Sequence, residues 1–248
     1  MNRYYIIFIL AVLAVGACKS PQKKSRKNYV DSNVVINDTL FLRREIRDSV
    51  LYQTVYVDPN KNSPAYLSAF IYNSLDSSDI KRYLTAINKK SPKLKKFNTY
   101  GLSTNWRPVY QYKSKYYLYD PSDGGVKAVN VLTDSVMMFD IFGDGYLPIA
   151  LQSVTKVSDH IFNIKLLHQL DEQASLPKEL NIYIIDHKTN MTVWEFKTDG
   201  EPKYQLMVPK EHVKELPIAI NAHYVGMREE YDFEKIDFKK LIAGVDPK

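Results

Sequence analysis

A long succession of short, strand-like segments in the C-terminal half is the feature that most constrains how this chain folds. From Trp106 onward, β-branched and aromatic residues recur in short runs that turn-forming residues interrupt, which is typical of strands and hairpins. Residues 109–112 and 116–119 flank Lys113–Lys115 and predict a tyrosine-rich hairpin. No helical pattern separates the runs, which argues against a doubly wound α/β fold. The further predicted strands are 126–132, 136–142, 147–156, 160–168, 180–187, 191–197, 203–208 and 217–225.

This spacing predicts an antiparallel β-meander, closed as a barrel or folded as a sandwich. Two or three short strands are expected within residues 33–57 and a helical pair near residues 64–90. The protein is therefore predicted to be mainly β, and α+β overall. Residues 33–99 and 100–248 are the predicted domains, unless residues 33–248 form one.

The helical pair is predicted from caps and from periodicity. Ser63 and Pro64 suit the cap and the first position of a helix. The second helix carries an apolar stripe that more often contacts a core than a partner: Ile80, Tyr83, Leu84 and Ile87.

The first 18 residues, MNRYYIIFILAVLAVGAC, have the pattern of an export signal. Arg3 precedes an uncharged apolar run, which is shorter than the roughly 20 residues that a spanning helix needs. Small residues follow the run, as they do at a signal cleavage site.

The four residues Val15–Cys18 resemble the lipobox of bacterial lipoproteins, with Val15 where leucine is typical. The resemblance implies that residues 1–17 are a removed signal peptide and that Cys18 is lipidated and anchors the chain in a membrane. Cys18 is the only cysteine, which excludes a disulfide framework and a zinc site built on several thiolates. An ordinary secretory signal with an incidental cysteine is the alternative.

Residues 18–32 are predicted to be a flexible, basic tether. Lys and Arg recur in KSPQKKSRK without acidic neighbours, and the whole chain carries a formal net charge of +6. Basic side chains are attracted to anionic headgroups, and nucleic acid is not an expected partner of an exported protein. Lys19 is not the aspartate that resembles an inner-membrane retention signal, and the acidic cluster that resembles a surface-export signal of Bacteroidetes lipoproteins is absent. These comparisons imply an outer-membrane location that faces the periplasm.

No motif for catalysis, a metal or a cofactor is found. Glycine-rich phosphate loops and the G-x-S-x-G turn are absent. The five histidines form no close pair of ligand type in the sequence. We therefore expect no cofactor and no metal, and we favour a protein that is not an enzyme.

The tyrosine-rich hairpin is the candidate binding surface. Tyrosine combines apolar area with a polar tip, which suits stacking on a glycan or packing on an envelope protein. The alternative is that tyrosine simply forms good strands in a half-buried sheet. The surface comprises Trp106, Tyr110, Tyr112, Tyr117 and Tyr119.

Three tripeptides resemble the D-[ST]-aliphatic acceptor of Bacteroidetes O-glycosylation. They place candidate sites at Thr39, Ser49 and Ser135. Such sites have to be exposed, as loops usually are.

The favoured function is a membrane-anchored lipoprotein of the cell envelope that binds a partner or has a structural role. One alternative is a lipocalin-like carrier of an apolar ligand, although Gly101 and Trp106 are too far apart for the Gly-x-Trp signature of that family. Another alternative is a hydrolase whose active-site residues are dispersed. A large apolar cavity favours the carrier, and an interior filled by side chains favours the binding protein.

Overall fold

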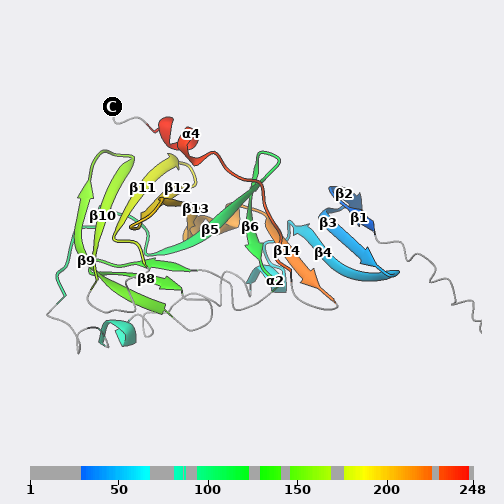
Figure 1. The fold of residues 1–248 in the computed structure, drawn as a ribbon, viewed down its shortest axis with the longest axis horizontal. Helices are drawn as coiled ribbons and strands as arrows, with labels where there is room; N and C mark the ends of the chain where they lie inside the picture. Colours follow the sequence, from blue (N-terminus) through cyan, green and yellow to red (C-terminus); the bar gives the residue numbers. More distant parts are fainter. Residues whose placement is uncertain are drawn as a thin grey trace, which may run out of the picture.

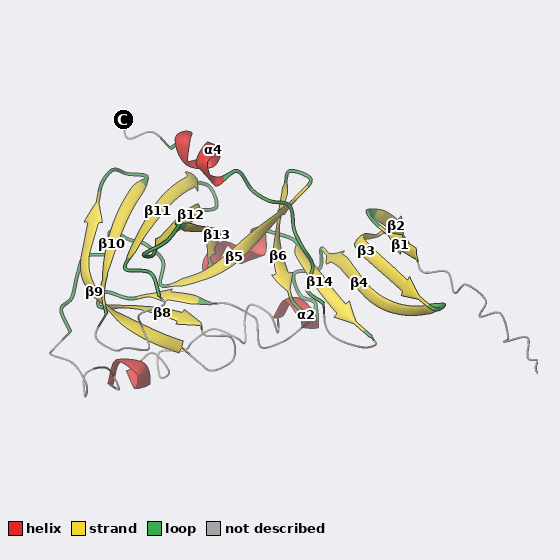
Figure 2. Ribbon diagram, viewed as in Figure 1, coloured by secondary structure: helices red, strands yellow, loops and turns green. Residues whose placement is uncertain are grey.

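The computed structural model describes residues 29–67, 81–85, 87, 94–122, 129–140, 146–168, 176–224 and 229–245. These residues are mostly β, with a few short helices, as the sequence predicts (Figure 2). None of the helices in this part of the chain is long and apolar enough to span a membrane.

Eight antiparallel strands close into a barrel (Figure 1). Seven of them follow one another around the wall as a meander, and β5 closes the ring by pairing with both β13 and β7. The prediction of an antiparallel meander is confirmed, with a barrel rather than a sandwich. The strands are β5 (Asn105–Tyr112), β7 (Asn130–Leu132), β8 (Val136–Asp140), β9 (Tyr146–Lys156), β10 (Ile161–Leu167), β11 (Glu179–Asp186), β12 (Met191–Lys197) and β13 (Lys203–Pro209).

A smaller open sheet extends from the barrel through the second half of β5. Residues Tyr110–Tyr112 of β5 pair with β6, and β6 pairs with β14, the one parallel pairing among the described strands. Residues 29–31, expected at the end of the tether, instead pair with β3 at the sheet edge. The sheet contains β1 (Tyr29–Asp31), β2 (Val34–Ile36), β3 (Thr39–Arg47), β4 (Val50–Asp58), β6 (Lys115–Asp120) and β14 (Ile218–His223).

Two-residue turns join the hairpins of this smaller sheet. Lys113 and Ser114 have φ values of 46° and 62°, and Asp48 and Ser49 have 54° and 67°. Positive φ at both central residues is the geometry that matches the right-handed twist of the strands. The hairpin predicted at Lys113–Lys115 is confirmed.

The helices are short and lie outside the barrel wall. In α2 (Pro64–Leu67), Ser63 Oγ accepts from the amide of Tyr66 at 3.1 Å, so the predicted cap is present. Most of the predicted second helix lies outside the described residues, but residues 81–85 and 87 are helical. Tyr83, Leu84 and Ile87 pack on the outer face of β7 and β8, as a core stripe does. Two further elements are the 3₁₀ helix η5 (Lys210–Glu215) and α4 (Phe238–Ala243).

Alternation along the barrel strands produces two apolar layers. Inward-facing residues, among them Trp106, Phe162 and Trp194, fill the barrel interior. Outward-facing residues such as Val193 and Leu206 pack against Leu118 and other residues of the smaller sheet. The two sheets therefore share a strand and a core.

Candidate binding groove

A wedge opens where β5 leaves the barrel. The β13–β5 register runs from Pro209↔Trp106 to Leu206↔Val109 and then ends, because the next residues of β5 pair with β6. The first residues of β13, Lys203–Gln205, keep β12 as their partner on the other side. The two strands thus diverge and leave a gap between the barrel and the smaller sheet.

Residues 231–238 form the second wall of this gap. The amide of Glu234 donates to the carbonyl of Gln111 at 3.3 Å. Phe233 lies 4.7 Å from Tyr110 and Phe238 stacks on Tyr204 at 5.5 Å, measured between ring centroids. The segment is therefore held against both β5 and β13.

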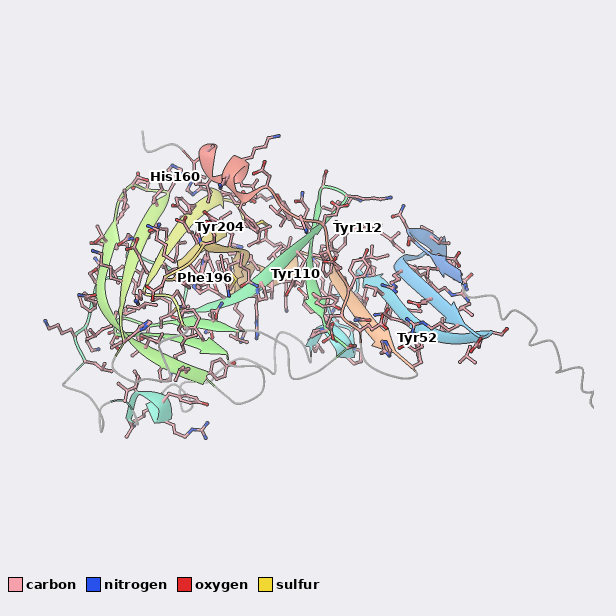
Figure 3. All side chains as sticks on the ribbon, viewed as in Figure 1. Tyr52, Tyr110, Tyr112, His160, Phe196 and Tyr204 are labelled. Atoms are coloured by element: carbon pink, nitrogen blue, oxygen red, sulfur yellow. The ribbon has the colours of Figure 1, made fainter. Side chains whose placement is uncertain are left out.

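The resulting groove has a volume of about 690 Å³. Its lining combines aromatic rings with amides and with charges of both signs. Figure 3 labels three of the rings: Tyr110 of β5, Tyr204 of β13 and Phe196 of the adjacent β12. The aromatic lining is Tyr110, Phe196, Tyr204, Tyr231, Phe233 and Phe238; the polar lining is Gln111, Lys203, Gln205, Asp232, Glu234 and Lys235.

A polar row on the outer barrel face fixes the tyrosine of β13. Asn181 Nδ2, Tyr183 Oη and Tyr204 Oη donate to the carboxylate of Glu195 at 2.7, 2.9 and 2.9 Å. Asn163 continues the row by donating to Asn181 Oδ1 at 2.7 Å. Burial alone would raise the pKa of Glu195, but the three hydrogen bonds outweigh it and leave that pKa below 4.5. The sequence analysis missed this row, although its members occupy outward positions of adjacent strands.

A second network fixes the C-terminal segment to the smaller sheet. Tyr119 Oη donates to Glu230 at 2.6 Å and accepts from Asn221 Nδ2 at 2.8 Å and from the amide of Tyr231 at 2.9 Å. Burial, and then the hydrogen bond to Glu230, raise the pKa of Tyr119 well above 10.0. Tyr119 is therefore a structural anchor of the groove wall.

The predicted tyrosine surface is not a free surface. Trp106 and Tyr117 are 1% and 3% exposed and belong to two different apolar cores, so they cannot contact a ligand from the surface. Tyr112 and Tyr119 contact Tyr231 and Phe233 of the C-terminal segment. Of these five predicted residues, only Tyr110 lines the groove. The reason is that β5 passes from the barrel into the smaller sheet, and the C-terminal segment covers the face of the hairpin that the sequence predicts to be exposed.

The candidate acceptor residues differ in exposure. Ser49 is exposed in its hairpin turn and Thr39 is half-buried. Ser135 is only 6% exposed, which is unfavourable for modification of the folded chain. Cys18 lies outside the described residues.

His160 and His187 lie at one end of the barrel and His212 lies in η5, whereas His168 directly follows β10 and His223 is the last residue of β14 in the smaller sheet. His160 and His187, far apart in sequence, meet with ring nitrogens 2.5 Å apart, a pairing that the sequence analysis did not predict. His212 Nδ1 lies 2.6 Å from Glu215 Oε1. The neighbouring carboxylate of Glu211 does not take part in this contact and accepts a hydrogen bond from Ser103 Oγ at 3.0 Å. Among the described residues, His, Cys, Asp and Glu form no group of three or more that could hold a metal ion.

Comparison with protein-family models, with curated proteins and with solved structures found no significant match to this chain.

Proposed function

We propose that this chain is a lipid-anchored protein of the bacterial cell envelope that binds a glycan chain in the groove between β5, β13 and residues 231–238, without catalysing a reaction. The observation that carries the proposal is the lining of the groove. Half-buried aromatic rings lie beside side-chain amides and charges of both signs.

A neutral, hydroxyl-rich ligand suits this lining. Aromatic rings pack on the apolar faces of sugar rings, and amides can both donate to and accept from hydroxyl groups. Lys203 and Lys235 are balanced by Asp232 and Glu234 in the groove, so no single charge dominates. A polyanion would be expected to meet an excess of basic side chains instead.

The barrel interior supports the binding protein over the lipocalin-like carrier. Trp106 and Trp194 are almost fully buried inside the barrel and meet with their ring centroids 5.3 Å apart. An eight-stranded barrel is only wide enough for side chains to fill it or for one small ligand. Aromatic rings that contact one another inside the barrel favour the filled arrangement.

The lipobox-like residues support the anchor. Cys18 precedes Tyr29, the first described residue, by 11 positions (29 − 18). Such a segment reaches at most about 40 Å when fully extended. The folded body would then work close to the membrane surface, where envelope glycans are present.

Two variants test the groove. Gln205→Ala and Gln111→Ala each remove a lining amide without removing a core side chain. We expect each to weaken binding of a neutral envelope oligosaccharide at least about tenfold, measured by titration calorimetry. Gln152→Ala is the matched control, since Gln152 is exposed on β9. Equal affinity for all three variants, or no oligosaccharide binding by the wild type, contradicts the proposed ligand.

The anchor is tested separately with Cys18→Ser. We expect the wild-type chain in the membrane fraction to begin at a diacylglycerol-modified Cys18, and the variant to lose this modification. Mass spectrometry that finds an unmodified Cys18 thiol in membrane-bound wild type contradicts the anchor but leaves the groove untouched.

A further inference from the structure

Two histidine rings meet at one end of the barrel, on neighbouring hairpins. His160 precedes β10 and His187 follows β11, and Nδ1 of His160 lies 2.5 Å from Nε2 of His187. The ring centroids are 4.4 Å apart with an interplanar angle of 70°, so the rings meet edge to face rather than stacked. Figure 3 marks His160 at this end of the barrel.

The backbone beside both rings is held by hydrogen bonds. The amide of Ile184 donates to the carbonyl of His160 at 2.8 Å. In the other hairpin, the carboxylate of Asp186 accepts from the amide of Lys188 at 2.9 Å and from the hydroxyl of Thr189 at 2.7 Å. Because both attachment points are fixed, little further ordering is needed to keep the two ring nitrogens together.

Facing ring nitrogens at this distance need one hydrogen between them, donated by one ring and accepted by the other. Two lone pairs would repel each other, as would two N–H groups, so the pair can share a single proton. A divalent transition-metal ion can take the place of that proton, since neutral imidazole nitrogen is a preferred ligand of such ions. Two bonds of about 2.0–2.1 Å to a tetrahedral ion place the nitrogens about 3.3 Å apart, so the side chains need to separate by less than about 1 Å.

The pair is accessible from solvent. His187 is exposed and His160 is half-buried, so an ion from solvent can reach both. Asp159 is directly adjacent and is bonded to Lys156 at 2.5 Å.

We propose that His160 and His187 form a binding site for a divalent transition-metal ion of the Zn²⁺ and Cu²⁺ class. The described residues bring no third histidine, cysteine or carboxylate ligand to the pair, so water completes the coordination. The ion would link the β9–β10 hairpin to the β11–β12 hairpin. This site is independent of the proposed glycan groove.

Titration of the full-length chain in detergent with ZnCl₂, after removal of metal by a chelator, tests this site. We expect one zinc ion per chain in the wild type, and at least about tenfold weaker binding in both His160→Gln and His187→Gln. Saturating zinc should raise the melting temperature of the wild type by about 2–4 °C and leave that of the two variants unchanged. Without metal, all three chains should melt at similar temperatures, because the two side chains are partly exposed.

His212→Gln is the matched control, because His212 is also a paired histidine and should not contribute to the site. Zinc binding that persists in both variants of the His160–His187 pair overturns the proposal, as does a loss confined to the His212 variant. No zinc binding by the wild type also overturns it. Cu²⁺ should bind more tightly than Zn²⁺ at an imidazole site, and the reverse order would count against it.

Discussion

Single carboxylate and hydroxyl groups hold the walls of the groove in place. Glu195 is the clearest case, because one half-buried carboxylate accepts three side-chain hydrogen bonds from β11 and β13. Hydrogen bonds to a charged group contribute more to stability than those between neutral groups. The shape of the groove therefore depends on Glu195, a residue that does not itself line it.

Replacing Glu195 by glutamine should lower the free energy of unfolding at pH 7 by about 1–3 kcal/mol, because an amide NH₂ group then faces donors. The pKa of Glu195 is lowered in the folded state, so its stabilisation is present above pH 4.5 and is lost as the pH falls through the folded value. Urea unfolding between pH 7 and pH 3 should therefore show a smaller loss of stability in Glu195→Gln than in wild type. Glu201→Gln, at an exposed position, should follow the wild-type curve.

Tyr119→Phe should destabilise the C-terminal segment by about 1–3 kcal/mol, since the lost hydroxyl serves Glu230, Asn221 and the amide of Tyr231. Hydrogen exchange should show faster exchange at the amide of Tyr231. Tyr116→Phe is the control, because this half-buried tyrosine of the same strand lies outside the network. Equal exchange in both variants would show that the hydroxyl does not hold the segment.

At the scale of elements, each hairpin turn is set by local residues and can be improved locally. Lys113 and Ser114 both adopt positive φ, where residues with a Cβ atom are strained and Asn-Gly is preferred. The native turn is therefore not optimal for its own geometry.

The double substitution Lys113→Asn with Ser114→Gly should raise the free energy of unfolding by about 0.5–1 kcal/mol, measured by urea denaturation. Lys188→Gly tests the reason for this effect. Lys188 is an exposed turn residue that is not among those with positive φ, so glycine there should be neutral or destabilising. A gain of similar size at both turns would mean that positive φ is not the cause.

At the scale of the whole molecule, the barrel and the smaller sheet share β5 and one apolar core. Leu118 of β6 is fully buried in that core together with Val193 and Leu206 of the barrel. Both tryptophans lie inside the barrel, so their fluorescence reports on the barrel alone. The shared core predicts that the two sheets unfold together.

Leu118→Ala should therefore destabilise the chain by about 2–5 kcal/mol and shift the fluorescence and far-ultraviolet circular dichroism transitions together. The mutated residue lies in the smaller sheet, so a shift in tryptophan fluorescence measures coupling to the barrel. Leu167→Ala, at a side chain that is 40% exposed, should change little. Separate transitions for the two probes would mean that the sheets unfold independently.

The sequence by itself determined where most strands lie. The predicted segments 191–197 and 203–208 differ by at most one residue from β12 and β13, because alternation and turn residues are local signals that each strand carries. The same local signals determined the Lys113–Ser114 turn and the cap at Ser63.

Only the tertiary structure decided which strands meet outside the meander and which side chains stay exposed. The parallel pairing of β14 with β6 and the cover of Tyr112 and Tyr119 by Tyr231 and Phe233 join segments about 100 residues apart, for which no local pattern exists. Because these contacts are not local, the hairpin that the sequence predicts to be a tyrosine surface instead anchors the C-terminal segment. The groove likewise depends on where β5 leaves the barrel, and the His160–His187 pair depends on which hairpins are neighbours. The order of strands around the closed barrel determines both features, and the residue types alone do not.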